Sequence, residues 1–358
     1  MTESDRVVRR FLEAQDRLVI QASDLSLETI SNMVEDGSID IGPKFQRRER
    51  WKREKQSALI ESFLLNVPVP PIYLSEDDFG TYSVIDGKQR IMSIHTFMKG
   101  DLSLRGLREF TSIDGLALAD LPAQMQNALR VRPYLRAVTL LKQSDPELKY
   151  EVFTRLNTGG EPLNPQEIRN VAFRGPLNTL IYQLAEADFL RHQLKIRGPG
   201  SSAFRVMADA EYVLRFFTLQ DRWESFSGDL RRSMDDFMKE NRDSTGESLA
   251  SYRMLFESSL DACQRVWGES AFKRPVESGG WRDQMLAGMY DAQMLSVSSL
   301  SPEEVELLVR NSDRALEAIQ DLFREDAEFE EAVRRATNTP SRIRYRVRRM
   351  QDLLRALL

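Results

Sequence analysis

The sequence predicts an α+β protein, with an α/β domain at residues 1–175 followed by a mainly α-helical domain at residues 176–358. Short runs of β-branched or aromatic residues, which are typical of strands, occur only in the first half. One of these runs passes through a glycine turn into an amphipathic helix. From about residue 176 onward the pattern is that of helices separated by loops rich in Gly, Ser and Pro. The length of 358 residues fits two domains, or one α/β domain with a large helical appendage.

The first half alternates expected helices and strands. A helix is expected after the N-cap residue Ser26, and a second follows the charged stretch 44–55. Two strands at 71–74 and 82–85 could form a hairpin, and the Asp86-Gly87 turn leads from the second strand into a helix.

A further strand is expected at 136–141, followed by an amphipathic helix that ends at Asn157-Thr158-Gly159-Gly160. Asn164, Pro165 and Glu167 then have the spacing of a capping box with proline at the first helical position. We therefore expect another helix to begin there.

The composition is that of a soluble globular protein, with 41% hydrophobic and 29% charged residues and a formal net charge of −5. The acidic balance argues against indiscriminate coating of nucleic acid. A single cysteine, Cys263, excludes an internal disulfide framework, and the sequence has neither a signal-peptide profile nor a long apolar run. We therefore expect a cytoplasmic protein that does not span a membrane.

The last two expected helices carry opposite charges. Residues 303–331 are rich in Glu and Asp, whereas the final helix holds five arginines beside an apolar seam. The arginines are Arg342, Arg344, Arg346, Arg348 and Arg349, and the seam comprises Ile343, Val347, Met350, Leu354 and Leu357. The final helix could face DNA, but we favour a helix packed by its seam, with arginines solvated or paired to the acidic neighbour.

The segment from Asp86 to Arg90 has the most chemical content. Gly87, between a strand and a helix, would let a ligand approach the free N–H groups of the helix start, where phosphate binds readily. Lys88 and Arg90 could add charge-assisted hydrogen bonds, Gln89 could orient water or a ribose hydroxyl, and Asp86 could hold magnesium or a proton. Considered alone, the pattern is more often mere helix capping.

Two other segments are candidates for ligand contacts. Residues 45–53 surround Trp51 with five basic side chains, which could stack a base and neutralise phosphates. A solvated loop anchored by Trp51 explains the same pattern equally well. Near the glycine-rich helix end, Arg155 and Asn157 form the third candidate, which considered alone indicates only a helix stop.

These segments occur together in the order found in the N-terminal family of GmrSD-type restriction enzymes (domain of unknown function 262), which the chain resembles along nearly its whole length. The resemblance rests on Ile41 to Arg47 with Trp51, Val67 to Leu74, Asp86 to Arg90, Phe153 to Asn157 and Gln166 to Asn170. Lys88 stands where the family usually has glutamine, which adds a charge and leaves the nucleotide preference open.

The resemblance implies a ParB/sulfiredoxin-like α/β core whose signature lies in a nucleotide-phosphate pocket, and a helical second half. The ligand it implies is a nucleoside triphosphate, with magnesium as an optional ion at Asp86. The implied catalytic residues are Asp86, Gln89 and Arg90, and the implied nucleotide-binding residues are Gln46, Arg47, Gly87, Lys88, Arg155 and Asn157.

The leading hypothesis is an NTPase of a bacterial anti-phage or restriction system, with nuclease activity in the same pocket as a further option. The alternative is a non-hydrolysing sensor or adaptor that binds nucleotide or modified DNA and recruits a separate nuclease or toxin subunit. A purely structural partner is a third option, which the retained signature disfavours. With only His95 and His192, far apart in sequence, we expect no built-in HNH nuclease. DNA, an effector subunit and a second copy of the chain are the candidate partners.

Overall fold

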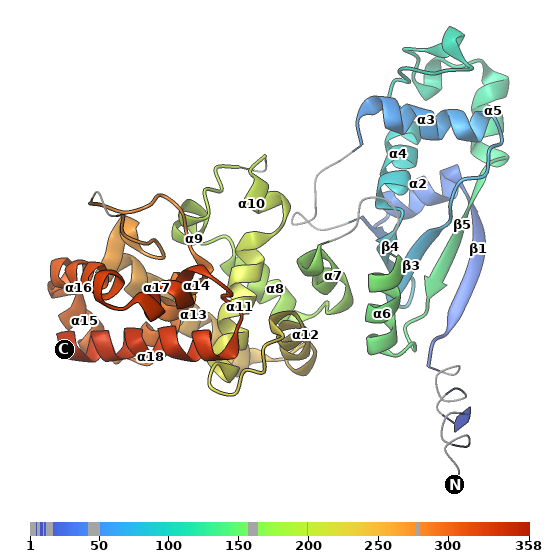
Figure 1. Ribbon diagram of the computed structural model, residues 1–358. Coiled ribbons are helices and arrows are strands. Elements are labelled where there is room, and N and C mark those ends of the chain that lie inside the picture. Colours follow the sequence, from blue (N-terminus) through green and yellow to red (C-terminus); the bar gives the residue numbers. More distant parts are fainter. Residues whose placement is uncertain are drawn as a thin grey trace. The chain divides into compact units, whose positions relative to one another are not determined.

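The computed structural model describes residues 5, 8, 9, 11, 17–41, 51–156, 164–198, 200–276 and 279–358. The chain divides into two compact units, Met1–Ala172 and Phe173–Leu358. The α+β class predicted from the sequence is confirmed, because the first unit holds a small sheet with flanking helices and the second is helical (Figure 1).

The first unit is built on a mixed five-stranded sheet. Its strands are β1 (Ile20–Ser26), β2 (Ile39–Asp40), β3 (Ile72–Asp78), β4 (Thr81–Asp86) and β5 (Tyr134–Leu140). They lie in the order β1-β5-β3-β4-β2, and β3 and β4 form the expected antiparallel hairpin. β5 is parallel to β3 and antiparallel to β1, and β2 is parallel to β4. The signature segment thus follows directly on β4, one strand from the edge of the sheet.

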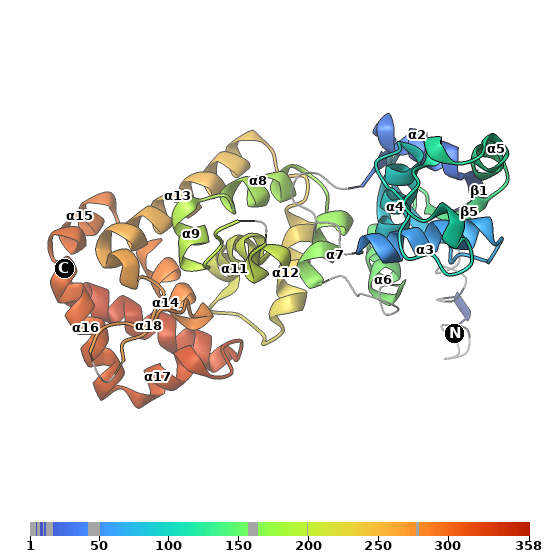
Figure 2. The ribbon, with the colours of Figure 1, turned by 90° about the horizontal axis from the view of Figure 1, so that it is seen from above.

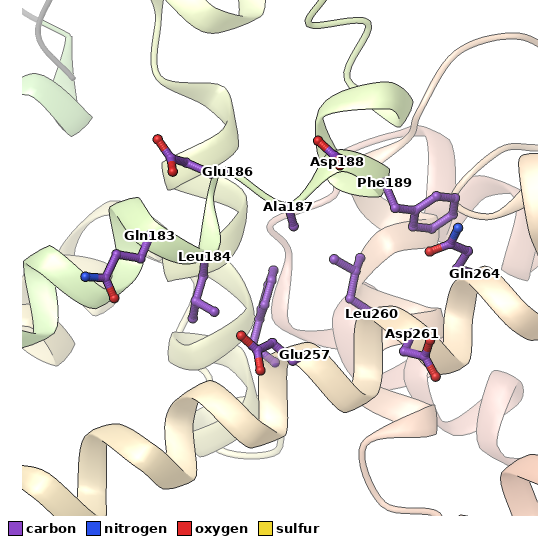
Figure 3. Close-up of a pocket in the computed structure, with 11 residues that line it drawn as sticks. Gln183, Leu184, Glu186, Ala187, Asp188, Phe189, Glu257, Leu260, Asp261 and Gln264 are labelled. Atoms are coloured by element: carbon purple, nitrogen blue, oxygen red, sulfur yellow. The ribbon is translucent and has the colours of Figure 1, made fainter. Parts of the chain in front are cut away.

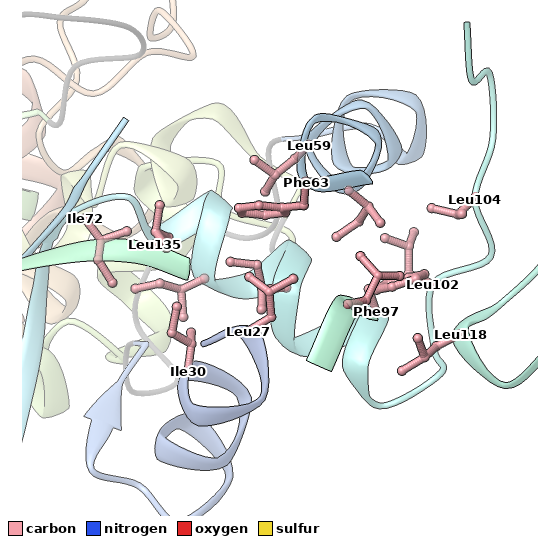
Figure 4. Close-up of a cluster of buried hydrophobic side chains, with 14 of the residues drawn as sticks. Leu27, Ile30, Leu59, Phe63, Ile72, Phe97, Leu102, Leu104, Leu118 and Leu135 are labelled. Carbon is pink, nitrogen blue, oxygen red and sulfur yellow. The ribbon is translucent and has the colours of Figure 1, made fainter. Parts of the chain in front are cut away.

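Helices cover both faces of this sheet. They are α2 (Leu27–Glu35), α3 (Arg53–Leu64), α4 (Lys88–Met98), α5 (Ala123–Val131), α6 (Pro146–Leu156) and α7 (Pro165–Ala172). Val84 packs into the large apolar cluster formed with α2, α3 and α4, which Figure 4 shows in part. The next residue, Ile85, packs instead with Phe153 of α6 and Ile168 of α7. Because successive strand residues point to opposite faces, α6 and α7 lie on the face opposite α4.

The helix starts follow the capping residues that the sequence indicated. The Ser26 hydroxyl accepts the N–H of Thr29 at 3.0 Å, which fixes the start of α2. At α7, the Asn164 side chain accepts the N–H of Glu167 at 2.9 Å. The Glu167 carboxylate in turn accepts the N–H of Asn164 at 2.8 Å. The predicted capping box is therefore confirmed.

The second unit packs its helices around α14, whose residues from Gly288 to Val297 are all buried. α14 packs against α11, α13, α17 and α18, and Figure 2 shows α18 beside it. The helices are α8 (Pro176–Leu184), α9 (Asp188–Gln193), α10 (Ser202–Arg205), α11 (Ala208–Arg222), α12 (Leu230–Glu240), α13 (Gly246–Trp267), α14 (Ala287–Val297), α15 (Pro302–Arg310), α16 (Ser312–Glu325), α17 (Ala327–Arg334) and α18 (Pro340–Leu357). No helix in the described part of the chain is long and apolar enough to cross a membrane.

The final helix is packed by its apolar seam, as the sequence favoured. Ile343, Val347, Met350 and Leu354 are at most 1% exposed. Arg342 and Arg349 pair with Glu331 and Asp326 of the preceding acidic region, at 3.1 and 2.8 Å.

Arg346 behaves differently from the other arginines of α18. Its side chain is fully buried and pairs with Asp291 of α14, which also binds Arg215 of α11 at 2.6 Å. This buried cluster of two guanidinium groups and one carboxylate was not predicted from the sequence.

Candidate functional site

The candidate site is the strand–glycine–helix unit that joins β4 to α4. Gly87 caps α4 with φ of 95° and ψ of 10°, in the left-handed region that favours glycine. A Cβ atom at this position would lie 2.4 Å from Cγ2 of Ile72 on the neighbouring strand β3. Backbone conformation and close packing therefore both require glycine here.

The start of α4 is open and carries positive charge. Within the described residues, no side chain caps this helix end, and its first turn holds Lys88, Gln89 and Arg90 but no acidic residue. The unpaired N–H groups of a helix start and the helix dipole together favour an anion. This geometry can hold a phosphate group.

Arg90 is held in place by two oxygen atoms. Its Nη2 donates to Oδ2 of Asp86 at 2.6 Å and to the carbonyl oxygen of Pro71 at 3.1 Å. The side chain is only 15% exposed, and its Nε is buried with no hydrogen-bond partner in the described structure. Asp86 thus orients Arg90, and Arg90 retains an unused donor.

Lys88 is half-buried and lies near two carboxylates. Burial lowers the pKa of Lys88 to about 8, whereas the negative charges of Glu167 and Asp40 act in the opposite direction. The first residue of α4 is therefore electrostatically coupled to α7 and to the end of β2. This link joins two segments that are far apart in the sequence.

Gln89 lies against the chain at Trp51. The backbone N–H of Trp51 donates to Oε1 of Gln89 at 3.4 Å, and the Lys55 ammonium lies 4.5 Å from the centre of the Trp51 ring. Within the described residues, the side-chain amide of Gln89 is thus engaged by a single long hydrogen bond.

The structure brings five predicted site residues together at one helix start, namely Asp86, Gly87, Lys88, Gln89 and Arg90. Arg155 is 77% exposed on the last turn of α6, where it pairs with Glu151 at 2.5 Å. The predictions for Gln46, Arg47 and Asn157 fall outside the residues that the structure describes.

A magnesium ion would have to share the Asp86 carboxylate with Arg90. Across the described ranges, no group of three or more His, Cys, Asp or Glu side chains is arranged to hold a metal. Mg²⁺ is commonly held by one or two carboxylates together with substrate phosphates and water. A single carboxylate beside a helix start that could hold a phosphate group fits that mode of binding.

Sequence analysis assigned no ligand role to the polar residues of α7. Gln166, Glu167, Arg169 and Asn170 are each at most 4% exposed, which is unusual for residues of this type. Their charged and amide side chains in the first turns of an amphipathic helix were the available signal. The capping box accounted for the presence of Glu167 but not for the other three polar residues.

The second unit contains a separate hollow of about 460 Å³ between α8, α9 and α13 (Figure 3). Leu184, Phe189 and Leu260 form apolar parts of its wall, and Glu257 and Asp261 are among its acidic residues. None of the signature residues lines it, and the sequence had given no reason to expect it.

Fold and site together define an α+β domain with a strand–glycine–helix unit whose helix start carries basic residues. Residues 28–174 match the family model of the GmrSD restriction endonuclease, N-terminal domain. Residues 28–174 are therefore a domain of that family, and the resemblance seen in the sequence is confirmed for these residues. No curated protein and no solved structure matches the chain.

Proposed function

We propose that the protein is a component of a bacterial restriction or anti-phage system, and that it binds and hydrolyses a nucleoside triphosphate at the start of α4. The observation that carries this proposal is the uncapped helix start after Gly87, with Lys88 and Arg90 in its first turn. The family match of residues 28–174 supports the restriction context, because the family is named for a restriction endonuclease.

The geometry suggests a distinct role for each signature residue. The N–H groups of the first turn would cradle a phosphate, and Arg90 would stabilise the negative charge that develops on the transferred phosphoryl group. Asp86, which bonds Nη2 of Arg90 at 2.6 Å, would act as a positioning residue for that arginine. Gln89 would orient the attacking water once its 3.4 Å hydrogen bond to Trp51 is released.

Magnesium, when bound, would neutralise phosphate charge beside the helix start. The Asp86 carboxylate is the group of this chain that would hold it. Gln46, Arg47, Arg155 and Asn157 remain predicted contributors to nucleotide binding.

The second candidate function is a sensor that binds nucleotide without hydrolysing it and recruits a separate nuclease or toxin subunit. One observation favours it: the Asp86 carboxylate, the only one in the signature, is already engaged by Arg90. The Oδ2 atom of Asp86 already accepts a hydrogen bond from Arg90, so it cannot at the same time accept the proton of an attacking water.

Phosphate release by the purified protein with each nucleoside triphosphate, with and without magnesium and DNA, tests the proposal. Arg90→Ala should lower both nucleotide affinity and turnover, whereas Lys99→Ala at the other end of α4 should change neither. Gln89→Ala should reduce turnover more than affinity, because orienting water matters mainly in the transition state. Binding without phosphate release in the wild type would support the sensor instead, and absence of binding would refute both.

Direct contact with DNA would come from the basic segment around Trp51, since Arg342, Arg346 and Arg349 of α18 already have acidic partners. Loss of phosphate-contacting charge weakens binding almost uniformly across sequences and flattens its salt dependence. We expect this effect for the double variant Arg48→Ala/Arg50→Ala but not for Arg344→Ala/Arg348→Ala. An unchanged salt slope in both variants would assign DNA recognition to a partner protein.

A further inference from the structure

The first turn of α7 contains a buried amide group that the proposed function does not use. Gln166 has no exposed surface. Its Oε1 accepts a hydrogen bond from Nη1 of Arg169 at 3.3 Å, which orients the amide. Its Nε2 has no hydrogen-bond partner in the part of the chain that the structure describes. Buried polar groups are nearly always hydrogen-bonded, so an unpaired donor of this kind requires an explanation.

One packing contact and one electrostatic interaction place this turn beside the candidate site. Ile168, two residues after Gln166, packs in one cluster with Ile85, the residue before Asp86 on β4. Glu167, the next residue after Gln166, acts through its charge on Lys88, the first residue of α4. The start of α7 therefore lies at the end of β4, where α4 begins.

A second unused donor belongs to the same site. Nε of Arg90 is buried and also lacks a partner within the described residues. Gln166 and Arg90 belong to the two helices that meet at the end of β4. Donors without acceptors on both helices are expected if the missing acceptors are supplied by a bound ligand.

We propose that the nucleotide site extends to α7, and that the Gln166 amide donates a hydrogen bond to an oxygen atom of the bound nucleoside triphosphate. This inference rests on the proposed nucleotide site and adds a ligand-contacting residue to it. A phosphate oxygen and an oxygen of the base or ribose satisfy the donor equally well. Inorganic tripolyphosphate separates these sources, because it carries only the first.

The role of Gln166 can be tested by measuring nucleotide affinity and melting temperature together. A residue that contacts the ligand lowers affinity when it is replaced, whereas a residue needed for folding lowers the melting temperature as well. Gln166→Glu keeps an acceptor for Arg169 but buries a negative charge, so it should lower the melting temperature of the free protein, whereas Gln166→Met removes the unpaired donor without adding charge and should change the melting temperature little. In Gln166→Glu, nucleotide affinity should fall about tenfold or more, through loss of the donor and repulsion of phosphate. Gln166→Met, which adds no charge, should also weaken nucleotide binding.

Gln293 provides the matched control, since it too is fully buried and has an Nε2 without a partner in the described structure, but it lies on α14 of the other unit. Gln293→Met should leave nucleotide affinity unchanged. Dissociation constants for each nucleoside triphosphate and for tripolyphosphate would be measured by calorimetry, and melting temperatures without ligand by scanning calorimetry.

The outcomes distinguish this inference from the proposed function. If the wild type binds nucleotide and both Gln166 variants bind it equally well, the inference fails and the proposed function survives. If Gln166→Met loses melting temperature and affinity together, the residue is structural and the inference also fails. If the wild type binds no nucleotide and no tripolyphosphate, the proposed function itself is refuted.

Discussion

Replacement of Lys88 by methionine should stabilise the free protein, although the substitution falls in the signature segment. Burial lowers the pKa of Lys88 from 10.5 to about 8 despite the nearby carboxylates of Glu167 and Asp40. Each unit of pKa corresponds to about 1.4 kcal/mol, so folding disfavours the charged ammonium by roughly 3 kcal/mol. This figure already includes the attraction of the two carboxylates, and solvent screening at the half-buried side chain reduces it. We therefore expect Lys88→Met to raise the free energy of unfolding at pH 7 by roughly 1–2 kcal/mol.

The pH dependence gives a sharper test than the stability at one pH. Because the folded pKa lies below the unfolded one, the folded protein loses its proton first as the pH rises. Between about pH 8 and pH 10.5 the unfolded chain binds more protons, so this lysine makes the free energy of unfolding increase with pH in that window. Below pH 8 both states are protonated, and the destabilising effect is present in full.

Urea unfolding at pH 7 and pH 9.5 would measure the effect in the wild type, in Lys88→Met and in Lys99→Met. Lys99 is the control on the same helix, with a side chain that is 35% exposed and paired with Glu35. The advantage of Lys88→Met over the wild type should shrink at pH 9.5, and Lys99→Met should show no such change. The reasoning would be refuted if Lys88→Met were less stable than the wild type at pH 7, or if its stability had the same pH dependence.

Three further substitutions test the packing around the site and in the helical unit. Gly87→Ala should lower the free energy of unfolding by roughly 2–5 kcal/mol, through strain at positive φ and overlap with Ile72. The control Gly80→Ala, at φ of 80° with no atom near the added Cβ, should lower it by only about 1–2 kcal/mol. Equal losses of stability in thermal melts would contradict this argument. Asp291→Asn should destabilise the protein by about 3–5 kcal/mol, because the buried guanidinium groups of Arg215 and Arg346 lose their carboxylate. A loss below about 1 kcal/mol in urea unfolding would mean that other groups neutralise the two arginines. Burial raises the pKa of Glu61, but hydrogen bonds from the N–H groups of residues 108–110 outweigh this effect and hold the pKa below the ordinary 4.5. The contribution of the ionised carboxylate to stability should therefore be lost as the pH falls through the folded pKa. Glu61→Gln should lower the free energy of unfolding by about 1–3 kcal/mol at pH 7 and by less at pH 3.

The elements that the sequence predicted well are those encoded by neighbouring residues. Ser26 caps α2, the capping box at Asn164 and Glu167 starts α7, and Gly87 separates β4 from α4 as expected. In each case the hydrogen bond or the backbone conformation involves residues a few positions apart. Such signals do not depend on the rest of the fold.

Strand β1 was not predicted, because its stability comes from residues far away in the sequence. Its sequence, Ile20 to Ser26, is largely polar and exposed, and it lies at the edge of the sheet. It pairs with β5, more than 100 residues later, through Ile20 with Leu140 and Ser26 with Tyr134. A polar edge strand has no apolar alternation from which it could be recognised.

The geometry of the candidate site was predicted where it is continuous in the sequence and missed where it is not. The strand, the glycine turn and the helix start at Asp86 to Arg90 were expected from the residues, whereas the ligand role of this segment was inferred from the family resemblance and stays a prediction. The coupling of Lys88 to Glu167 joins positions 79 residues apart and depends on α7 packing against β4. The buried pairing of Arg346 with Asp291 was missed for the same reason, since helical spacing indicates a face but not the partner of that face.

The charges around the start of α4 lead to a last prediction, which concerns magnesium. The described residues at this site bring two cations, Lys88 and Arg90, near three carboxylates, those of Asp86, Glu167 and Asp40. A nucleoside triphosphate adds several negative charges to this nearly balanced set. Repulsion from the carboxylates would oppose binding unless a divalent cation neutralises part of the phosphate charge.

We therefore expect nucleotide affinity to fall at least tenfold when magnesium is removed with EDTA, and Asp86→Asn to reduce this dependence on magnesium. Asp101→Asn, after the far end of α4, should leave the dependence unchanged. Calorimetric titrations of nucleotide with and without magnesium would measure these effects. If the wild type bound nucleotide equally well in EDTA, the carboxylates would not oppose the phosphates, and the ligand would have to contact the helix start away from Asp86.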